Sequence, residues 1–371
     1  MLIGIDGSRA LVKDKAGVEN YSYELIKAML ELKEIKKHKL RLYVRGGVEV
    51  EAEWRKKLEV VEIKWPRLWT QGGLALECLR QSPDVLFIPA HTLPVVRRRK
   101  MKTVVTIHGL EYEYLPEYYK FPQRLYLNKS TEYAVKQADR LIAVSKSVKQ
   151  ELVERLGADK RKIKVVYEGV SSRLKEAKKG RFSSQYMRQI RHKYGLEKRY
   201  ILFVGTIQPR KNIGRLIEAF SRLKDKEVQL VIGGKKGWMY EEIMKAPKKW
   251  GVEKRVKFTG RIAEADLAWV YKGASLFCWP SLMEGFGLPI LEAMLMGIPV
   301  ITSNRGALPE ISGQAALEVE AEDVGELTEA MDLVLENQDL REGLVEKGYG
   351  RVKQFSWQKA GQETLKVLTE W

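Results

Sequence analysis

Residues 284–292 read Glu-Gly-Phe-Gly-Leu-Pro-Ile-Leu-Glu and place two carboxylates eight positions apart, on either side of a glycine-framed turn. The apolar run over 276–279 predicts a buried strand before this turn. Pro289 suits the first turn of a helix, which we expect over 288–296 because a glycine and a proline follow it. A strand, a glycine turn and a helix N-terminus together favour an anion-binding site, since the first N–H groups of a helix have no partner within it.

The two carboxylates add a second requirement to the ligand of this segment. Glu284 and Glu292 flank the turn, and carboxylates accept hydrogen bonds from hydroxyl groups. A ligand with both a diphosphate and hydroxyls fits this arrangement, and a nucleotide sugar is such a ligand.

The length of the chain, 371 residues, predicts two domains of ordinary size. No apolar run reaches the roughly 18 to 20 residues that span a bilayer, and the N-terminus leads directly into a strand pattern, so we expect a cytoplasmic protein. Cys78 and Cys278 are the two cysteines, and we expect them to fill the cores rather than to bind metal or form a disulfide.

The formal net charge of +18 requires an explanation. Lysines and arginines gather in the stretches 33–41, 97–102 and 160–198. Such a surface attracts nucleic acid, an anionic membrane or phosphorylated small molecules, although a solvated basic surface is an equally good interpretation. No nucleic-acid-binding module is recognisable, so we expect no nucleic-acid partner. Among the functional interpretations, peripheral contact with the inner face of a membrane fits best.

Short β-branched runs alternate with amphipathic segments along the chain. The first series covers 2–5, 40–44, 60–63, 85–88, 104–107 and 141–144, and a second covers 201–204, 228–232, 256–258, 276–279 and 298–302. This alternation predicts an α/β fold with two doubly wound parallel sheets. Ligands of such sheets bind beyond the carboxyl ends of the strands, so we expect a cleft between the two domains.

A basic segment follows the strand expected over 201–204. It reads Gly205-Thr206-Ile207-Gln208-Pro209-Arg210-Lys211-Asn212, and we expect Asn212 to cap the next helix. Arg210 and Lys211 then lie at the carboxyl edge of the sheet, where cations neutralise phosphate. An exposed basic pair in a basic protein is the alternative for these two residues taken alone.

Other candidates also follow predicted strands. His108 comes directly after 104–107, where a histidine can donate or accept a hydrogen bond at a reacting sugar; we expect it to face the ligand, whereas His91 is a weaker candidate. Gly17 and Val18 precede the first long helix, although a single glycine also fits an ordinary turn. The Gly-Arg-Ile segment 260–262, with Arg261 and Ile262, is placed to meet a nucleobase edge through its backbone.

Several common cofactor motifs are missing. The first strand turn lacks G-x-G-x-x-G and the chain has no G-x-x-x-x-G-K-[ST], which argues against a dehydrogenase and a P-loop NTPase. No Asp-x-Asp pair occurs either, so a divalent cation would lack that carboxylate pair beside the diphosphate. We therefore expect no metal and no cofactor, with a GDP- or UDP-linked sugar as substrate.

At this point the residues resemble the retaining glycosyltransferases of family 4, whose GT-B fold has two Rossmann-like domains facing a central cleft. The resemblance covers nearly the whole chain. Glu284 and Glu292 are similar to the family's E-x7-E motif in the context EGFGLPILEAM, and VGTIQPRKN is similar to its basic phosphate segment. Residues 16–18 are similar to its N-terminal glycine loop, and His108 is similar to its active-site histidine.

The resemblance implies a role for each matched position. Glu284 would contact hydroxyls of the donor sugar and Glu292 the ribose, while Arg210 and Lys211 would stabilise the departing nucleoside diphosphate. His108 would contact the sugar. The predicted catalytic residues are His108, Arg210, Lys211 and Glu284. The predicted donor-binding residues are Gly17, Val18, Gly205, Thr206, Arg261, Ile262, Gly285, Phe286, Gly287, Leu288 and Glu292.

Two departures from the family pattern matter. Many members carry Asp after the histidine, where this chain has Gly109, and many carry Arg after the glycine that corresponds to Gly205, where this chain has Thr206. The second departure places more of the phosphate charge on Arg210 and Lys211. The predicted domains are an acceptor-side domain over 1–175, onto which a C-terminal helix within 355–371 packs back, a linker over 176–195 and a nucleotide-sugar domain over 196–354.

The sequence therefore predicts a retaining, metal-independent hexosyltransferase that acts on a saccharide or lipid-linked acceptor in surface polysaccharide or glycoconjugate synthesis. The segments TIQPRKN and GWMYEE favour a GDP-mannose-type mannosyltransferase. A non-catalytic protein that binds nucleotide or an anionic polymer is the alternative from another class. A GT-B epimerase or phosphorylase is the nearer enzymatic alternative.

Overall fold

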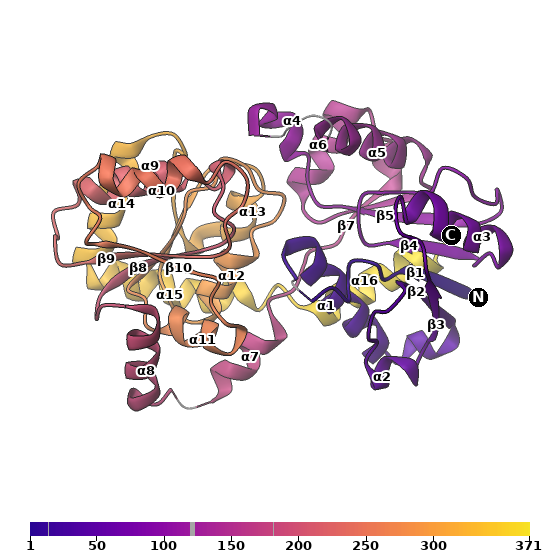
Figure 1. Ribbon diagram of the computed structural model, residues 1–371, viewed down its shortest axis with the longest axis horizontal. Helices are drawn as coiled ribbons and strands as arrows, with labels where there is room; N and C mark the ends of the chain where they lie inside the picture. The colour runs from indigo at the N-terminus through magenta and orange to yellow at the C-terminus, as the bar shows by residue number, and fades with distance from the viewer. Residues whose placement is uncertain (14, 119–122, 181) are drawn as a thin grey trace. The chain divides into compact units, whose positions relative to one another are not determined.

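The computed structural model describes residues 1–13, 15–118, 123–180 and 182–371. The chain forms two compact units, each with its own sheet (Figure 1). Unit 1 consists of Met1–Gly169 and Phe355–Trp371, and unit 2 consists of Val170–Gln354. Each unit is considered by itself below.

The described part of unit 1 contains a seven-stranded parallel sheet in the order β3-β2-β1-β4-β5-β6-β7. Most of its strands are short runs of Val, Ile and Leu buried on both faces, as in parallel sheets covered by helices. The strands are β1 (Leu2–Asp6), β2 (Lys39–Arg45), β3 (Glu59–Ile63), β4 (Val85–Ile88), β5 (Lys102–Ile107), β6 (Arg140–Ala143) and β7 (Ile163–Val165).

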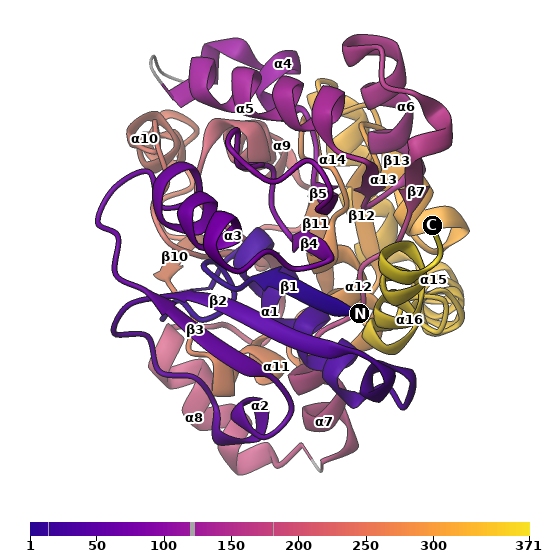
Figure 2. The same ribbon diagram turned by 90° about the vertical axis from the view of Figure 1, so that its right-hand side faces the viewer.

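Helices cover both faces of the unit 1 sheet (Figures 1 and 2). Helices α1 and α16 pack together on one face, and α3, α5 and α6 lie on the other. The helices are α1 (Gly17–Glu31), α2 (Ala52–Arg55), α3 (Ala75–Arg80), α4 (Glu111–Tyr114), α5 (Gln123–Gln137), α6 (Lys146–Leu156) and α16 (Trp357–Thr369). Short 3₁₀ turns are η1 (Glu34–Lys37), η3 (Pro116–Tyr118) and η4 (Lys160–Lys162), and a π-helical turn, η2 (Thr70–Leu74), precedes α3.

Unit 2, in its described residues, contains a six-stranded parallel sheet in the order β10-β9-β8-β11-β12-β13. Strands β8 and β11 are central neighbours, and Leu276 pairs with Ile201 in their register. The loops that follow these two strands therefore start side by side at one edge of the sheet. The strands are β8 (Tyr200–Val204), β9 (Gln229–Gly233), β10 (Val256–Gly260), β11 (Leu276–Trp279), β12 (Val300–Ser303) and β13 (Leu317–Val319).

The unit 2 sheet is also covered on both sides. Helices α9, α10 and α14 lie on one face, and α11 and α15 lie on the other (Figure 1). The helices are α7 (Ser172–Lys179), α8 (Ser184–Tyr194), α9 (Ile213–Arg222), α10 (Glu241–Lys249), α11 (Glu264–Lys272), α12 (Leu288–Leu295), α13 (Leu308–Ser312), α14 (Val324–Glu336) and α15 (Gln338–Val352). The 3₁₀ turns are η5 (Pro209–Lys211) and η6 (Gly313–Ala315).

The boundaries differ from the predicted ones in the middle of the chain. The division between units falls after Gly169 rather than after 175, and residues 176–195, predicted as a linker, lie within unit 2. Helices α7 and α8 in this stretch pack against α11. The reason is their amphipathic pattern: Leu174 of α7 and Ile190 and Tyr194 of α8 are buried, although the stretch is basic overall.

The C-terminal helix belongs to unit 1. Helix α16 packs against α1, where Gly361 lies against the backbone of Ala28 and Met29. Cys78 and Cys278 are both free and buried, as expected of core residues. Among the described residues, no helix combines the length and the apolar character needed to cross a bilayer.

Candidate active site

The segment between β11 and α12 carries the first glutamate of the motif. Strand β11 ends at Trp279, and α12 begins at Leu288 with Gly287 at its N-cap. Gly287 has a φ of 109°, and a Cβ added there would come within 2.8 Å of Leu308 Cδ2. Glycine is therefore required at this position, both for the backbone conformation and for the close packing. The turn places Glu284 in the loop and Glu292 on the helix.

Glu284 is held by the two basic residues that follow β8. Arg210 Nη1 donates to Glu284 Oε2 at 2.9 Å, and Lys211 Nζ donates to Glu284 Oε1. Arg210 Nη1 also donates to the carbonyl of Met283 at 2.5 Å, and the backbone N–H of Leu282 donates to the carbonyl of Arg210 at 2.9 Å. Two loops that are more than 70 residues apart in sequence thus form one hydrogen-bonded cluster.

The cluster is largely buried, and its ion pairs set the charge state of Glu284. Glu284 is 6% exposed and Lys211 7% exposed. Burial alone would raise the pKa of Glu284, but the charges of Arg210 and Lys211 outweigh it and lower the pKa to about 2. Glu284 is therefore ionised at neutral pH and holds both cations in place.

Lys211 also contacts a pair of stacked aromatic rings. Lys211 Nζ lies 4.6 Å from the ring centroid of Trp279, and Trp279 stacks on Phe203 with ring centroids 4.8 Å apart. A Cβ at Gly205 would come within 2.6 Å of the Trp279 ring. The predicted residues Gly205 and Lys211 are thus brought together by an indole ring that sequence reasoning did not include, although Trp279 is the last residue of the predicted strand.

Asn212 lies at the N-cap position of α9, as predicted, but its side chain makes no capping hydrogen bond. Its backbone is left-handed, with a φ of 58°, and its Nδ2 donates to the carbonyls of Pro280 at 3.0 Å and Ala321 at 2.5 Å. The N–H of Leu216 is bonded to the carbonyl of Asn212 instead. The Asn212 amide thus hydrogen-bonds two loop carbonyls. Buried carbonyls need such partners, so the side chain serves the loops rather than the first N–H groups of α9.

Glu292 has a different environment. It is half-buried on α12, and its Oε2 accepts a hydrogen bond from the hydroxyl of the buried Tyr271 at 3.0 Å. Burial raises the pKa of Glu292 to about 7, and the Tyr271 hydroxyl only partly opposes this. A carboxyl with such a pKa is present in both charge states near neutral pH.

The other predicted donor-binding residues of unit 2 are spread over two loops. Gly285, Phe286 and Leu288 belong to the turn before α12 and its first residue. Thr206 follows Gly205 directly. Beyond β10, Gly260 has a φ of 68°, Arg261 is exposed and Ile262 is buried, its Cδ1 lying where a Cβ at Gly233 would point.

His108 lies in unit 1 at the carboxyl end of β5. Its Nε2 lies 2.9 Å from the carbonyl of Pro89, and its Nδ1 lies 3.7 Å from Glu168 Oε1. The Tyr21 ring meets it edge to face, with ring centroids 4.5 Å apart. His91 is a neighbour, with ring centroids 5.6 Å apart, and burial lowers its pKa to about 3, so it is neutral.

Glu168 is the main residue of this cluster that sequence reasoning missed. It is 5% exposed and follows β7, just as His108 follows β5. The rule that site residues come directly after strands would have found it, had it been applied to the short strand at 163–165. Trp357 of α16 completes the cluster, with its ring centroid 5.8 Å from that of Tyr21.

The N-terminal glycine loop leads into α1, the helix that carries Tyr21. Helix α1 begins at Gly17, which is exposed and has no atom within 4 Å of an added Cβ, and Val18 follows it. Glu19 Oε2 accepts a hydrogen bond from the Ala16 N–H at 3.3 Å and Glu19 Oε1 one from Arg9 at 3.0 Å. The backbone at Gly17 thus leaves space for a ligand atom, and its role in donor binding stays a prediction.

The space beside Gly109, where many family members carry Asp, is filled by another carboxylate. An added Cβ there would come within 2.8 Å of Glu111 Oε2. The carboxylate of Glu111 therefore occupies the space beside position 109, and a larger residue at 109 would displace it.

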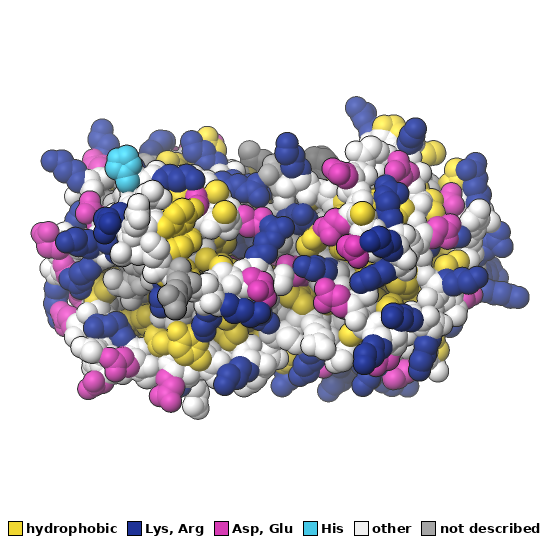
Figure 3. All heavy atoms as spheres, turned by 90° about the horizontal axis from the view of Figure 1, so that it is seen from below, with side chains coloured by type: hydrophobic (Ala, Val, Ile, Leu, Met, Phe, Trp, Pro, Cys, Tyr) yellow, Lys and Arg dark blue, Asp and Glu magenta, His cyan; other side chains and the backbone are white. Residues whose placement is uncertain are grey.

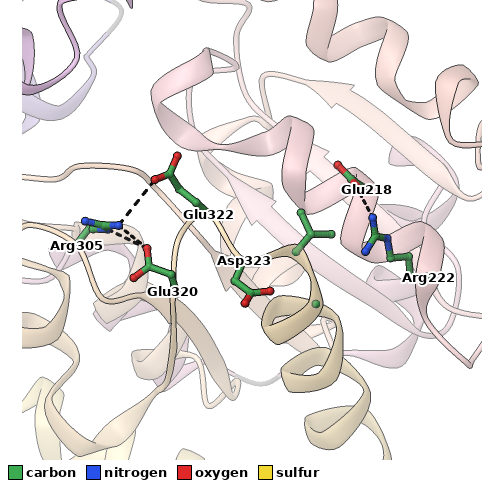
Figure 4. A pocket seen from close by; sticks show the side chains of 8 residues that line it. Glu218, Arg222, Arg305, Glu320, Glu322 and Asp323 are labelled. Carbon is green, nitrogen blue, oxygen red and sulfur yellow. Dashed lines mark hydrogen bonds and ion pairs between the residues drawn. The ribbon is translucent and has the colours of Figure 1, made fainter.

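A hollow of about 580 Å³ in unit 2 contains none of the predicted site residues (Figure 4). Its charged side chains contact one another: Arg222 pairs with Glu218, and Arg305 pairs with Glu320 and lies 3.9 Å from Glu322. Asp323 caps α14 by accepting from the N–H of Glu326 at 2.9 Å. These contacts serve the local structure, and we assign the hollow no ligand. Within the described residues, no group of three or more His, Cys, Asp or Glu side chains is arranged to hold a metal ion.

Comparison with known proteins bears on both units. A family model described as Glycosyltransferase Family 4 matches residues 16–173, and one described as Glycosyl transferases group 1 matches residues 187–351. The chain belongs to the family 4 glycosyltransferases. The chain is also 28% identical over 382 residues to the O-antigen chain mannosyltransferase B of Escherichia coli, with 94% of each sequence covered.

Solved structures show the same fold for this family 4 glycosyltransferase. Sucrose-phosphate synthase from Thermosynechococcus elongatus is similar with a TM-score of 0.78 and 18% identity, covering 100% of this chain and 98% of that one. Anabaena HepE, crystallised in complex with UDP-glucose, is similar with a TM-score of 0.74 and 18% identity, covering 100% of both chains. The two doubly wound units are those of the GT-B fold, as predicted.

Proposed function

We propose that this glycosyltransferase transfers a hexose, with mannose as the first candidate, from a nucleoside-diphosphate sugar to a hydroxyl of a saccharide or lipid-linked acceptor. The observation that carries the proposal is the Arg210–Lys211–Glu284 cluster at the carboxyl edge of the unit 2 sheet. Its two cations and the N-terminus of α12, which starts four residues after Glu284, favour a diphosphate.

The sugar and the nucleotide are inferred from relatives. The near full-length similarity to an O-antigen chain mannosyltransferase favours mannose and a surface polysaccharide product. The similarity to a protein crystallised with UDP-glucose supports a nucleotide sugar as the donor class. The sequence segments TIQPRKN and GWMYEE favour GDP over UDP.

We further propose that the transfer retains the anomeric configuration and needs no metal. Arg210 and Lys211 are fixed before the donor arrives, so they stabilise the charge that develops on the departing diphosphate without reorganisation. Retention then follows if the acceptor attacks on the face that the diphosphate leaves, with the acceptor proton passing to the diphosphate. Glu284 is committed to two cations and serves to position them rather than to attack the sugar.

Replacement of Lys211 tests the proposal. A hydrogen bond to a charged group contributes roughly 1.5 to 3 kcal/mol, so Lys211→Ala should lower kcat/KM for transfer from GDP-mannose at least about tenfold. Lys245→Ala is the matched control, because Lys245 is exposed and pairs with Glu242 on the surface. NMR of the product would show an anomeric configuration equal to that of the donor, and EDTA would leave the rate unchanged.

The opposite results are equally clear. Unchanged transfer by Lys211→Ala would remove the cluster from the donor site. An inverted product, or loss of activity in EDTA that Mg²⁺ or Mn²⁺ restores, would overturn the proposed mechanism while leaving the transferase assignment intact. Use of UDP-glucose in place of GDP-mannose would correct the donor alone.

A further inference from the structure

Tyr271 joins helix α11 to the second glutamate of the motif. Its side chain is fully buried, and its hydroxyl donates to Glu292 Oε2 at 3.0 Å. Its ring lies against that of Phe277 in β11, with ring centroids 5.6 Å apart. The two bonded residues are 21 positions apart in the chain, so the contact links Glu292 to a helix that is not part of the motif.

The hydrogen bond fixes one end of a carboxyl group that is only half-buried. A carboxylate has about four acceptor sites, and the Tyr271 hydroxyl occupies one of those on Glu292. The others can accept hydrogen bonds from hydroxyls of a ligand. A side chain that is already held in one orientation also loses less freedom when the ligand binds.

Burial and this hydrogen bond have opposite effects on the charge of Glu292. Burial raises the pKa of Glu292 to about 7, and the hydrogen bond from Tyr271 lowers it. The elements that pack against α12 are β11, β12, α7, α13 and α15, and no charged side chain in their described residues shifts this pKa. Without the Tyr271 hydroxyl the pKa would be higher, so less of the carboxyl would be ionised at pH 7.

Glu292 follows the proposed diphosphate site along the same helix. It lies four residues after Leu288, the first residue of α12, which is about 6 Å along a helix axis. In a nucleoside-diphosphate sugar the ribose is joined directly to the diphosphate. A diphosphate bound at the start of α12 therefore places the two ribose hydroxyls within reach of the Glu292 carboxyl.

Helix α11 is itself held in place by α8, in the stretch that was predicted as a linker. Asp266 of α11 is 3% exposed and accepts hydrogen bonds from the Tyr194 hydroxyl at 2.7 Å and from Lys193 at 2.6 Å. The Tyr194 hydroxyl accepts from the N–H of Ala263, directly before α11, at 3.1 Å. Helix α8 thus fixes both α11 and the end of the loop 260–262.

We infer that Tyr271 is a positioning residue for donor binding: its hydroxyl orients the Glu292 carboxylate and keeps it ready to accept hydrogen bonds from the ribose hydroxyls. This role rests on the proposed function, because it requires a nucleoside-diphosphate sugar as the ligand. An ionised carboxyl only accepts hydrogen bonds, so donor affinity should rise with pH as Glu292 loses its proton.

Most of the charge on the protein does not change between pH 6 and 8. The charged side chains on the face that Figure 3 draws are mainly Lys and Arg, with Asp and Glu among them, and the ordinary pKa values of all four types lie outside this range. The chain has 4 histidines, and burial lowers the pKa of His91 to about 3. Burial also raises the pKa of Glu151 in unit 1 to about 7, so Glu292→Gln is needed to assign a pH effect to Glu292.

Calorimetric titration with a nucleotide sugar at pH 6, 7 and 8 tests this role. GDP-mannose and UDP-glucose are both tried, and the series uses the one that binds; the diphosphate of each is esterified at both ends and does not titrate in this range. Wild-type protein should bind it about tenfold more weakly at pH 6 than at pH 8, since a carboxyl with a pKa of about 7 changes its ionised fraction by about that factor. Glu292→Gln should bind weakly at all three pH values.

Tyr271→Phe keeps the ring and removes the hydroxyl. It should weaken binding at least about threefold at pH 7, and its affinity should still be rising at pH 8. Tyr200→Phe is the matched control, because Tyr200 is equally buried and its hydroxyl donates to the carbonyl of Val270 at 2.6 Å rather than to Glu292. It should keep the wild-type pH profile. Circular dichroism and the melting temperature confirm that each variant is folded.

A double variant separates an effect through Glu292 from a general disturbance of the fold. Tyr271→Phe should have no further effect on affinity when Glu292→Gln is already present, because the group that it positions is then altered. Wild-type protein should also bind GDP more tightly than 2′-deoxy-GDP, and Tyr271→Phe should reduce this preference.

Three results would overturn the role of Tyr271 while leaving the proposed function intact. They are a wild-type affinity that does not change with pH, equal pH profiles for Tyr271→Phe and Tyr200→Phe, and a further loss when Tyr271→Phe is added to Glu292→Gln. If neither nucleotide sugar bound to the wild-type protein at any pH, the proposed function would be wrong, and the role of Tyr271 with it.

Discussion

Glu284 and Glu292 belong to the same nine-residue segment, yet their carboxyl groups have opposite electrostatic environments. Arg210 and Lys211 lower the pKa of Glu284 to about 2 against the effect of burial. Glu292 accepts a hydrogen bond from the Tyr271 hydroxyl, and burial raises its pKa to about 7. The difference shows that two glutamates of one motif can have unlike chemistry: one is a fixed anion that organises cations, and the other can change its charge near neutral pH.

The largest effect is expected when the charge of Glu284 is removed, because this abolishes the difference between the two glutamates. Glu284→Gln removes the carboxylate that the buried Lys211 and the half-buried Arg210 both contact, and the loss of one partner of a buried pair costs about 3–5 kcal/mol of unfolding free energy. Urea unfolding at pH 7 would measure this loss. Adding Lys211→Met to the same chain should restore part of the stability, because the buried cation that lost the Glu284 carboxylate is then absent.

A small effect would contradict this reading of Glu284. If Glu284→Gln lost less than about 1 kcal/mol, a figure typical of a surface ion pair, the cluster would not be the buried unit that the geometry indicates. A loss of activity in Glu284→Gln can follow from its loss of stability. Glu284→Asp keeps the negative charge and therefore tests the length of the side chain alone.

The second test places a side chain in the turn that separates the two glutamates. Gly287→Ala places a Cβ at a φ of 109° and against Leu308, which we expect to cost about 1–3 kcal/mol. Gly343→Ala in α15 is the control, because an added Cβ there meets no atom within 4 Å, and it should be neutral or slightly stabilising. Thermal unfolding of both variants would show the difference, and equal melting temperatures would mean that the turn is not constrained.

The third test compares how the two glutamates make the stability of the protein depend on pH. Because the pKa of Glu292 is raised in the folded state, the native protein holds an extra proton between about pH 4.5 and 7. Its contribution therefore lowers stability as pH rises through that window. Glu292→Gln removes this cost, so it should raise the unfolding free energy by about 1–2 kcal/mol at pH 8 and by much less at pH 5.

Glu284 should behave in the opposite way. Its pKa is lowered, so its contribution to stability is present above its ordinary pKa of 4.5 and is lost only as pH falls toward about 2. Urea unfolding between pH 5 and 8 separates the two residues. If the stability gained by Glu292→Gln did not change with pH, Glu292 would have an ordinary pKa and the contrast between the glutamates would disappear.

Much of this architecture could be predicted from local patterns. The β-branched runs located eleven of the described strands, and the sequence Gly-Leu-Pro after Glu284 predicted the start of α12, since a short parallel strand and a proline-led helix each have a local signature. Strands β7 and β13 were not predicted because each has three residues and is only partly buried. Helices α7 and α8 were taken for a linker because their basic composition outweighed a narrow apolar stripe.

The candidate site was predicted as a set of residues rather than as a set of contacts. Local patterns alone determined that Arg210, Lys211, Glu284, Glu292 and His108 follow strands or flank a helix start, because each such position is defined by a few neighbouring residues. Only the tertiary structure decided that Glu284 binds both cations, that Glu292 meets Tyr271 and that His108 lies beside Glu168. Those pairings join loops and helices that are distant in sequence, and the pKa values of the carboxyls depend on burial and partners that no local pattern contains.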